Sequence, residues 1–185
     1  MRYFVDLKPY FNFRMAYPKD TDLSETDYIG VHNYFYFQED IEYGIIGNHE
    51  VTVNIERTDD FDCVECNNQI ICLDSIPAKK IILAGACGWG QFRENFKFVF
   101  ADRSVCCASV FLGDWAWPPK IWIKGSMETE GRDLECSTLK EYKRRDGPAC
   151  IYYKIIELPD IKKIKQIILP DNICMYIFGI TLEAN

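Results

Sequence analysis

The segment from Lys163 to Leu182, KIKQIILPDNICMYIFGITL, constrains the fold more than any other part of this chain. Its apolar residues form two runs, Ile164–Leu169 and Ile173–Leu182, and the breaker Pro170-Asp171-Asn172 separates them. The residues of the second run that would share one face of a strand are Cys174, Tyr176, Phe178, Ile180 and Leu182. This period of two predicts a strand, a sharp turn and a long closing strand with one packed inner face. The pattern favours a β-sandwich, in which function is sought in the loops at the ends of the sheets.

Short strand patterns recur along the rest of the chain, and helical periodicity is weak. Phe96, Phe98 and Phe100 would share one strand face, and Ala101–Ser104 indicates a hairpin turn into the strand Val105–Leu112. The other expected strands are Tyr3–Leu7, Val51–Ile55, Ile70–Leu73, Lys80–Ala84, Ile121–Lys124 and Cys150–Leu158. A single helical turn is expected over Thr138–Lys143. About eight to ten strands predict one all-β domain over residues 1–185, a two-sheet antiparallel jelly-roll β-sandwich.

The chain is acidic, with a formal net charge of −7 and a pI of about 4.9. An acidic surface repels phosphate backbones and anionic lipids, so we expect neither nucleic acid nor a membrane as a partner. Residues 1–12 contain Arg2, Asp6 and Lys8, which do not fit the apolar core of a signal peptide. No apolar run approaches the roughly 20 residues needed to span a bilayer. These features predict a cytoplasmic protein.

The chain has nine cysteines at irregular spacing. Secreted frameworks usually pair an even number, so we expect reduced and mostly structural thiols. Cys63-x-x-Cys66 with Cys72 has a spacing that suits zinc, but a second Cys-x-x-Cys or Cys/His pair is missing. The adjacent Asn67-Asn68 indicates a tight turn between cysteines. We therefore predict no metal and no cofactor.

Several blocks of sequence, in this order, resemble a known family. They are Asp6–Asn12, Gln69–Leu73 with the lysine-containing turn Ile76–Lys80 and the strand Ile81–Ala84, the loop Gly85–Gly90, Phe96–Phe111 leading to Asp114-Trp115, and the closing blocks Ile167–Pro170 and Ile177–Leu182. The order is similar to that of galactose-binding-domain-like jelly rolls, which occur as carbohydrate-binding modules beside bacterial glycoside hydrolases. Gly30–Gly47 and Gly125–Gly147 have no counterpart. The resemblance implies a jelly-roll fold and carbohydrate binding, although such folds also serve as structural modules.

Aromatic residues in two loops provide the strongest candidate site. Trp89 lies in a glycine-rich loop, and Trp117 lies beside the turn that contains Asp114. A sugar is bound by a flat ring under its C–H face together with polar side chains that donate and accept hydrogen bonds in pairs. Arg93 and Asp114 supply such groups. Trp115 is expected to fill the end of the core.

The two histidines, His32 and His49, are too few for a three-histidine zinc site. His32 and Asn33 can belong to a sugar-binding loop or be ordinary polar groups of a turn. The candidate ligand-binding residues are therefore Trp89, Arg93, Asp114, Trp117, His32 and Asn33.

No nucleophile, base or metal cluster stands out, so the leading prediction is a non-catalytic carbohydrate-binding protein rather than an enzyme. The alternative is a structural or protein-interaction β-sandwich, with a protein partner or a homo-oligomer as a subunit of a larger assembly. A small enzyme ranks third.

Overall fold

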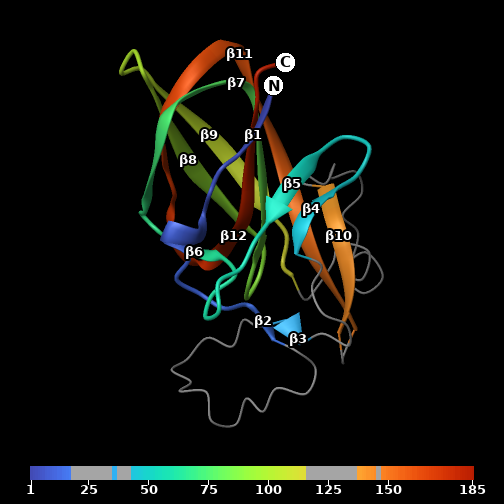
Figure 1. Ribbon diagram of the computed structural model, residues 1–185. Coiled ribbons are helices and arrows are strands. Elements are labelled where there is room, and N and C mark those ends of the chain that lie inside the picture. The colour runs from blue at the N-terminus through green and yellow to red at the C-terminus, as the bar shows by residue number, and fades with distance from the viewer. Residues whose placement is uncertain (18–34, 37–42, 116–136, 145–146) are drawn as a thin grey trace, which may run out of the picture.

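The computed structural model describes residues 1–17, 35–36, 43–115, 137–144 and 147–185, and these ranges consist mainly of strands (Figure 1). The strands are β1 (Arg2–Phe4), β2 (Ala16–Tyr17), β3 (Phe35–Tyr36), β4 (Gly44–Gly47), β5 (Thr52–Ile55), β6 (Val64–Asn67), β7 (Ile70–Cys87), β8 (Phe92–Phe100), β9 (Val105–Leu112), β10 (Ser137–Arg144), β11 (Gly147–Ile168) and β12 (Asp171–Glu183). Within the described ranges the helical element is one 3-10 turn, η1 (Lys8–Tyr10). The all-β prediction is confirmed for this part of the chain; the expected strand Ile121–Lys124 lies outside it. The described residues contain no helix that is long and apolar enough to cross a membrane.

Eight of the strands form one large sheet with the order β1-β12-β7-β11-β8-β9, in which β10 also pairs with β11 and β6 with β12. All pairs in this sheet are antiparallel. Two small sheets accompany it, the parallel pair β2-β3 and the antiparallel pair β4-β5. The pairing thus gives one continuous large sheet and not the two separate sheets that were expected. An all-β structure with one large antiparallel sheet is confirmed, while the jelly-roll sandwich stays a prediction.

The strands β7 and β11 hold the large sheet together because they pair along most of their length. The first part of β11 pairs with the last part of β7, from Tyr152 opposite Gly85 to Glu157 opposite Lys80. After a shift in register, the last part of β11 lies between the first part of β7 and β8. The two strands arch over the top of the molecule together, and β8 and β9 lie behind β1 and β12 (Figure 1).

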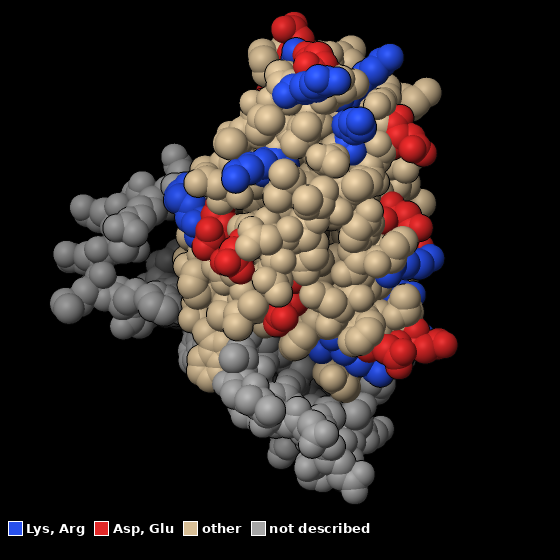
Figure 2. Space-filling model, turned by 90° about the vertical axis from the view of Figure 1, so that its left-hand side faces the viewer, with Lys and Arg blue, Asp and Glu red and all other residues tan. Residues whose placement is uncertain are grey.

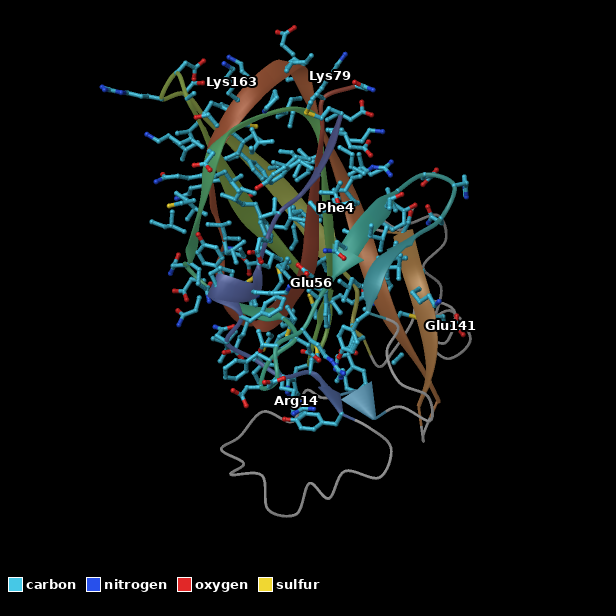
Figure 3. All side chains as sticks on the ribbon, in the orientation of Figure 1. Phe4, Arg14, Glu56, Lys79, Glu141 and Lys163 are labelled. Atoms are coloured by element: carbon cyan, nitrogen blue, oxygen red, sulfur yellow. The ribbon has the colours of Figure 1, made fainter. Side chains whose placement is uncertain are left out.

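Each of these long strands corresponds to two strands in the sequence analysis. Polar residues such as Asp74 and Lys79 interrupt the apolar pattern of β7, which made it look like two elements. In the structure both side chains are exposed, and Lys79 and Lys163 lie at the arch of β7 and β11 and point away from the core (Figure 3). The polar interruption therefore marks an exposed bend within a strand and not a loop.

Strand β12 was expected to bury one face, and in the structure both faces are buried from Met175 to Leu182. The second face is covered by β5. A Cβ at Gly179 would lie 2.7 Å from the carbonyl oxygen of Asn54, and the Thr181 hydroxyl donates a hydrogen bond to the carbonyl of Thr52 at 2.9 Å. Side chains of β12 alternate between its two faces as predicted. Neither face is exposed to solvent from Met175 to Leu182, because β5 packs against the face that was expected to be outside.

The aromatic residues that were expected in the core are buried. Phe96, Phe98 and Phe100 on β8 and Tyr176, Phe178 and Ile180 on β12 are at most 5% exposed. The predicted hairpin turn also forms, since Phe100 N donates to Ser104 O at 2.9 Å. It joins β8 to β9 in an unshifted register that runs from Val99 opposite Val105 to Phe92 opposite Leu112.

The predicted helical turn over Thr138–Lys143 is wrong. These residues belong to β10, which pairs with β11 and has a register shift between Thr138 and Lys140. Leu139 is buried, so the segment gains more from pairing and packing against a long strand than from one isolated helical turn.

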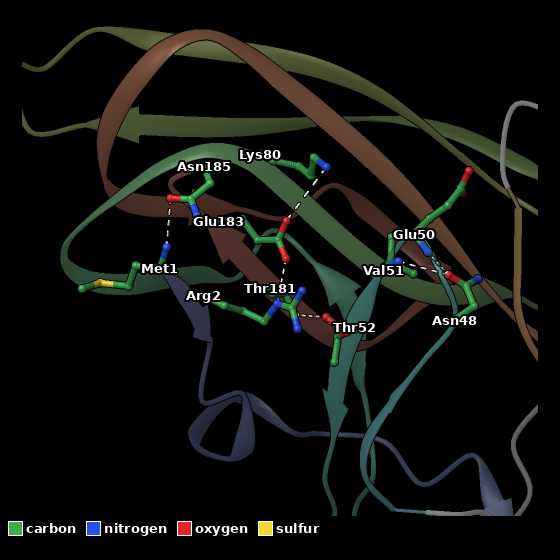
Figure 4. A network of polar contacts seen from close by, with 10 residues as sticks. All are labelled: Met1, Arg2, Asn48, Glu50, Val51, Thr52, Lys80, Thr181, Glu183 and Asn185. Atoms are coloured by element: carbon green, nitrogen blue, oxygen red, sulfur yellow. Dashed lines mark hydrogen bonds and ion pairs between the residues drawn. The ribbon is translucent and has the colours of Figure 1, made fainter.

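The two chain ends lie side by side at the top of the molecule (Figures 1 and 4). The amino group of Met1 donates to the side-chain oxygen of Asn185 at 3.1 Å. Glu183 accepts from Arg2 at 2.7 Å and lies 3.9 Å from the ammonium group of Lys80. These contacts join β1, β7 and β12 at the end of the sheet that carries the termini.

Candidate functional site

The connection between β7 and β8 presents an exposed tryptophan. β7 ends at Cys87 and β8 begins at Phe92. Between them Trp89 is 63% exposed and has a φ of 62°, while Gly90 has a φ of 136°. A positive φ is uncommon for a bulky residue, and it costs about 1–2 kcal/mol relative to ordinary backbone. Strain of this kind persists where surrounding contacts fix the backbone, and it is found preferentially at functional positions.

The buried side chain of Asp114 holds the backbone of this loop in place. Its side chain is only 4% exposed, and one carboxylate oxygen accepts a hydrogen bond from Gly90 N at 2.6 Å. The backbone around it is also tied to the end of β7. Cys87 N donates to Gly113 O and Trp115 N donates to Cys87 O, both at 2.8 Å. Asp114 therefore holds the residue next to Trp89, and the two loops adjoin in the structure.

Tyr152 on β11 supports the same segment from inside the core. This fully buried side chain donates its hydroxyl hydrogen to Asp114 O at 2.9 Å. A Cβ at Gly113 would lie 2.7 Å from the Tyr152 ring, so glycine is required for this close approach. Trp115 is 7% exposed, which confirms that it belongs to the core. The loop that carries the exposed indole is thus held by the Asp114 carboxylate, the Tyr152 hydroxyl and the backbone hydrogen bonds of Cys87.

Arg93 is exposed and lies on the outer face of β8, opposite Phe111 on β9. Its guanidinium carbon lies 5.5 Å from the centroid of the Phe111 ring, within the range of a cation–π contact. The structure therefore places Arg93 three residues beyond the hydrogen-bonded Gly90 and close to the candidate loop.

A polar pair beside the tryptophan loop was missed in the sequence. Asn172 at the start of β12 donates from its side-chain nitrogen to the Glu94 carboxylate at 2.8 Å. Its side-chain oxygen accepts from Cys174 N at 3.0 Å, and the carbonyl of Cys174 accepts from Gly88 N at 2.8 Å. The pair is therefore joined through β12 to the residue preceding Trp89.

Two signals in the sequence could have found this pair. Glu94 is the one charged residue in the series that continues through Phe96, Phe98 and Phe100 on the core side of β8. Asn172 belongs to the breaker that separates the two apolar runs. A carboxylate on an otherwise apolar strand face indicates either a buried partner or the open end of a core.

Three of the candidate residues, His32, Asn33 and Trp117, lie outside the described residues. The structure therefore joins Asp114 to the loop of Trp89 through Gly90, and it places Arg93 nearby on β8. The exposed ring and the part-buried Asn172–Glu94 pair combine an apolar platform with hydrogen-bonding groups.

The cysteines singled out by spacing do not form a metal site with one another. Cys63 and Cys66 are buried thiols on either side of Val64-Glu65, whereas Cys72 is exposed on β7. Burial raises the pKa of both buried thiols well above their usual value. Within the described ranges no three His, Cys, Asp or Glu side chains converge in a way that could hold an ion. Asn68, with a φ of 55°, lies between β6 and β7, but the expected tight hairpin does not form there, because both strands pair with β12 and not with each other.

The other described cysteines only partly follow the expected burial. Cys87 and Cys150 are buried, Cys106 and Cys174 are half-buried, and Cys107 is exposed on β9. All eight described cysteines are free thiols, and four of them are buried, as structural thiols are expected to be.

Asp62 is a further buried carboxylate. It lies two residues before β6, at the other end of that strand from Asn68. Its two oxygens accept hydrogen bonds from Met15 N and Ala16 N, both at 2.8 Å. Burial raises the pKa of this carboxyl, and the two N–H donors counteract part of that effect. Asp62 anchors the N-terminal segment to the sheet, which is a structural role.

No family model matches the chain, and no curated protein is significantly similar to it in sequence. The comparisons therefore identify no galactose-binding-like module, and the functional argument rests on the geometry of the site.

Proposed function

We propose that this protein is a non-catalytic carbohydrate-binding protein with a galactose-binding-like jelly-roll fold, and that Trp89 is the stacking platform of its site. The observation that carries the proposal is an indole that is 63% exposed, held in a strained backbone conformation above a buried carboxylate. A side chain with no binding role would gain nothing from this arrangement, because its ring is not used in the core.

The neighbouring polar groups suit a sugar. The C–H face of a pyranose would lie against the Trp89 ring, and its hydroxyl groups would reach Glu94 and Asn172 at the edge. A carboxylate accepts from hydroxyl groups and an amide both donates and accepts, so the pair can satisfy the paired hydrogen bonds of a sugar. Because the ring projects into solvent, the site is shallow and its affinity is expected to be low.

The proposal is tested by calorimetric titration with a panel of mono- and oligosaccharides. Trp89→Ala is expected to weaken binding of the recognised sugar at least tenfold, which corresponds to about 1.4 kcal/mol. Phe61→Ala is the matched control, because Phe61 is another exposed aromatic residue, at 40%, in a loop between β5 and β6. The control should bind as tightly as the wild type. If no sugar binds even at millimolar concentration, carbohydrate recognition is refuted.

The second candidate is a structural or protein-interaction module. It is favoured by the same exposed indole, because tryptophan is enriched among the residues that dominate protein–protein interfaces. The two candidates differ in one outcome. A sugar that binds the wild type and the Phe61 variant but not the Trp89 variant supports the first, whereas complete absence of sugar binding leaves the second.

A further inference from the structure

The outer strands of the large sheet differ in how their edges are protected. Natural proteins protect such edges with short strands, charged residues or bulges, because exposed main-chain groups invite pairing with another strand. β1 has three residues and β6 has four. β10 carries Lys140 and Glu141 and contains a register shift. β9 has eight residues, VCCASVFL, with no charged residue and no proline, and its register with β8 is unshifted.

Every second residue of β9 directs its main-chain groups away from the sheet. Phe100 N donates to Ser104 O, so alternate residues of β8 and β9 from this pair onward face each other with their N–H and C=O groups. The remaining residues of β9 have these groups on the outer edge. They are Val105, Cys107, Ser109 and Phe111. Among the described residues, no strand pairs with this edge.

We propose that the β9 edge pairs with the β9 edge of a second copy of this chain, antiparallel and about a two-fold axis at Ala108. In this register Val105 lies opposite Phe111 of the second copy, and Cys107 lies opposite Ser109 of the second copy. All four outward-facing residues then exchange main-chain hydrogen bonds with another outward-facing residue, as an antiparallel ladder requires. The large sheet continues from one subunit into the other.

The side chains of β9 complement themselves in this arrangement. Val105 is 56% exposed in the single chain, and the pairing places it against an aromatic ring, a combination that stabilises neighbouring strands. Ala108 is small, so its two copies fit at the axis. An isologous interface of this kind uses the same surface on both subunits and closes at a dimer.

The charges near the edge permit a second copy to approach. On the outer face, Lys97 lies opposite Cys107 and Asn95 lies opposite Ser109. In the proposed dimer the two Lys97 side chains are separated by three strand spacings, roughly 15 Å at about 4.8 Å each. This exceeds the screening length of about 8 Å at physiological salt, so their repulsion is small. Figure 2 shows the left-hand side of the molecule in Figure 1, where charged side chains lie mainly around the rim and the middle is largely uncharged.

The test is the oligomeric state of the full chain over a range of concentrations, by sedimentation equilibrium. The wild type is expected to be a reversible dimer. Ser109→Lys, which places a charge at the centre of the paired edge, should raise the dimer dissociation constant at least tenfold. Asn95→Lys is the matched control, because it adds the same charge on the same face directly opposite, one strand farther from the edge. This control should remain as dimeric as the wild type.

A second variant and a second measurement separate lost pairing from lost folding. Ser109→Pro removes an outward N–H that β8 does not use, so the subunit should keep its circular dichroism spectrum while the dimer dissociates. Amide hydrogen exchange should show concentration-dependent protection at Cys107 and Ser109. A monomeric wild type at all concentrations, or a dimer unaffected by both substitutions at Ser109, would overturn the proposal. It stands independently of carbohydrate binding, whose failure would leave these outcomes unchanged.

Discussion

The backbone conformation of Trp89 predicts which of two variants, Trp89→Gly or Trp89→Ala, is the more stable. At a φ of 62° an L-residue with a side chain costs about 1–2 kcal/mol, whereas glycine adopts the conformation without penalty. Glycine in turn loses about 0.5–1 kcal/mol more conformational entropy than alanine when a chain folds. From the midpoints of these two ranges, Trp89→Gly should be more stable than Trp89→Ala by about 0.75 kcal/mol.

Comparing the two variants with each other removes the contribution of the ring, because both lack it. The measurement is urea or thermal unfolding followed by circular dichroism. For a chain of this size the difference corresponds to a melting temperature higher by about 1–4 °C in the glycine variant. If the loop had ordinary backbone angles in solution, alanine would be the more stable residue. An alanine variant that melts above the glycine variant would therefore refute the strained loop. Both variants should lose carbohydrate binding equally.

Two further predictions concern buried contacts. Gly113→Ala should lower the free energy of unfolding by about 1–3 kcal/mol, because its Cβ would lie 2.7 Å from the Tyr152 ring; an unchanged denaturation midpoint would show that the ring can move aside. Asp62→Asn should lower stability by about 1–3 kcal/mol, since an amide cannot accept from both Met15 N and Ala16 N. Burial raises the folded-state pKa of Asp62 above its ordinary value of 3.8, so the folded protein holds this proton more tightly than the unfolded chain. Its contribution to stability is then largest in acid and is lost as the pH rises through the folded-state pKa. The free energy of unfolding, measured as a function of pH, should fall over this range in the wild type and not in Asp62→Asn. Identical pH profiles for the two proteins would contradict the prediction.

The strands were predictable where the apolar pattern is short and uninterrupted. β9 was predicted with the bounds Val105–Leu112 that it has in the structure, and the turn before it was placed correctly. β12 was found, but the covering of its second face was not, because the strand that covers it lies more than a hundred residues earlier in the chain. The helical turn predicted over Thr138–Lys143 failed because strand pairing is a long-range effect that local sequence does not contain.

The candidate site was predictable in its parts and not in its arrangement. Trp89 and Asp114 were chosen because tryptophan and a carboxylate in loops suit a sugar, and the structure joins their loops through Gly90. Asn172 and Glu94 are separated by 78 residues in the chain, and nothing in either local pattern indicates the other. In the large sheet β7 and β11 lie between β12 and β8, so this contact joins strands that are not neighbours and depends on how the sheet curves around its core.

The neighbouring chain ends have a practical consequence for building new proteins from this fold. Lys80 lies opposite Glu183 and Cys87 lies opposite Met175, so the tryptophan loop is seven residues, or roughly 23 Å, along the strand from the termini. A short linker between Met1 and Asn185 would join the ends, and new ends could be opened at the exposed turn Ala101–Ser104. Such a circular permutant should keep the same sheet. In the unpermuted chain, a domain fused to Met1 or to Asn185 would lie away from the tryptophan loop and leave it accessible.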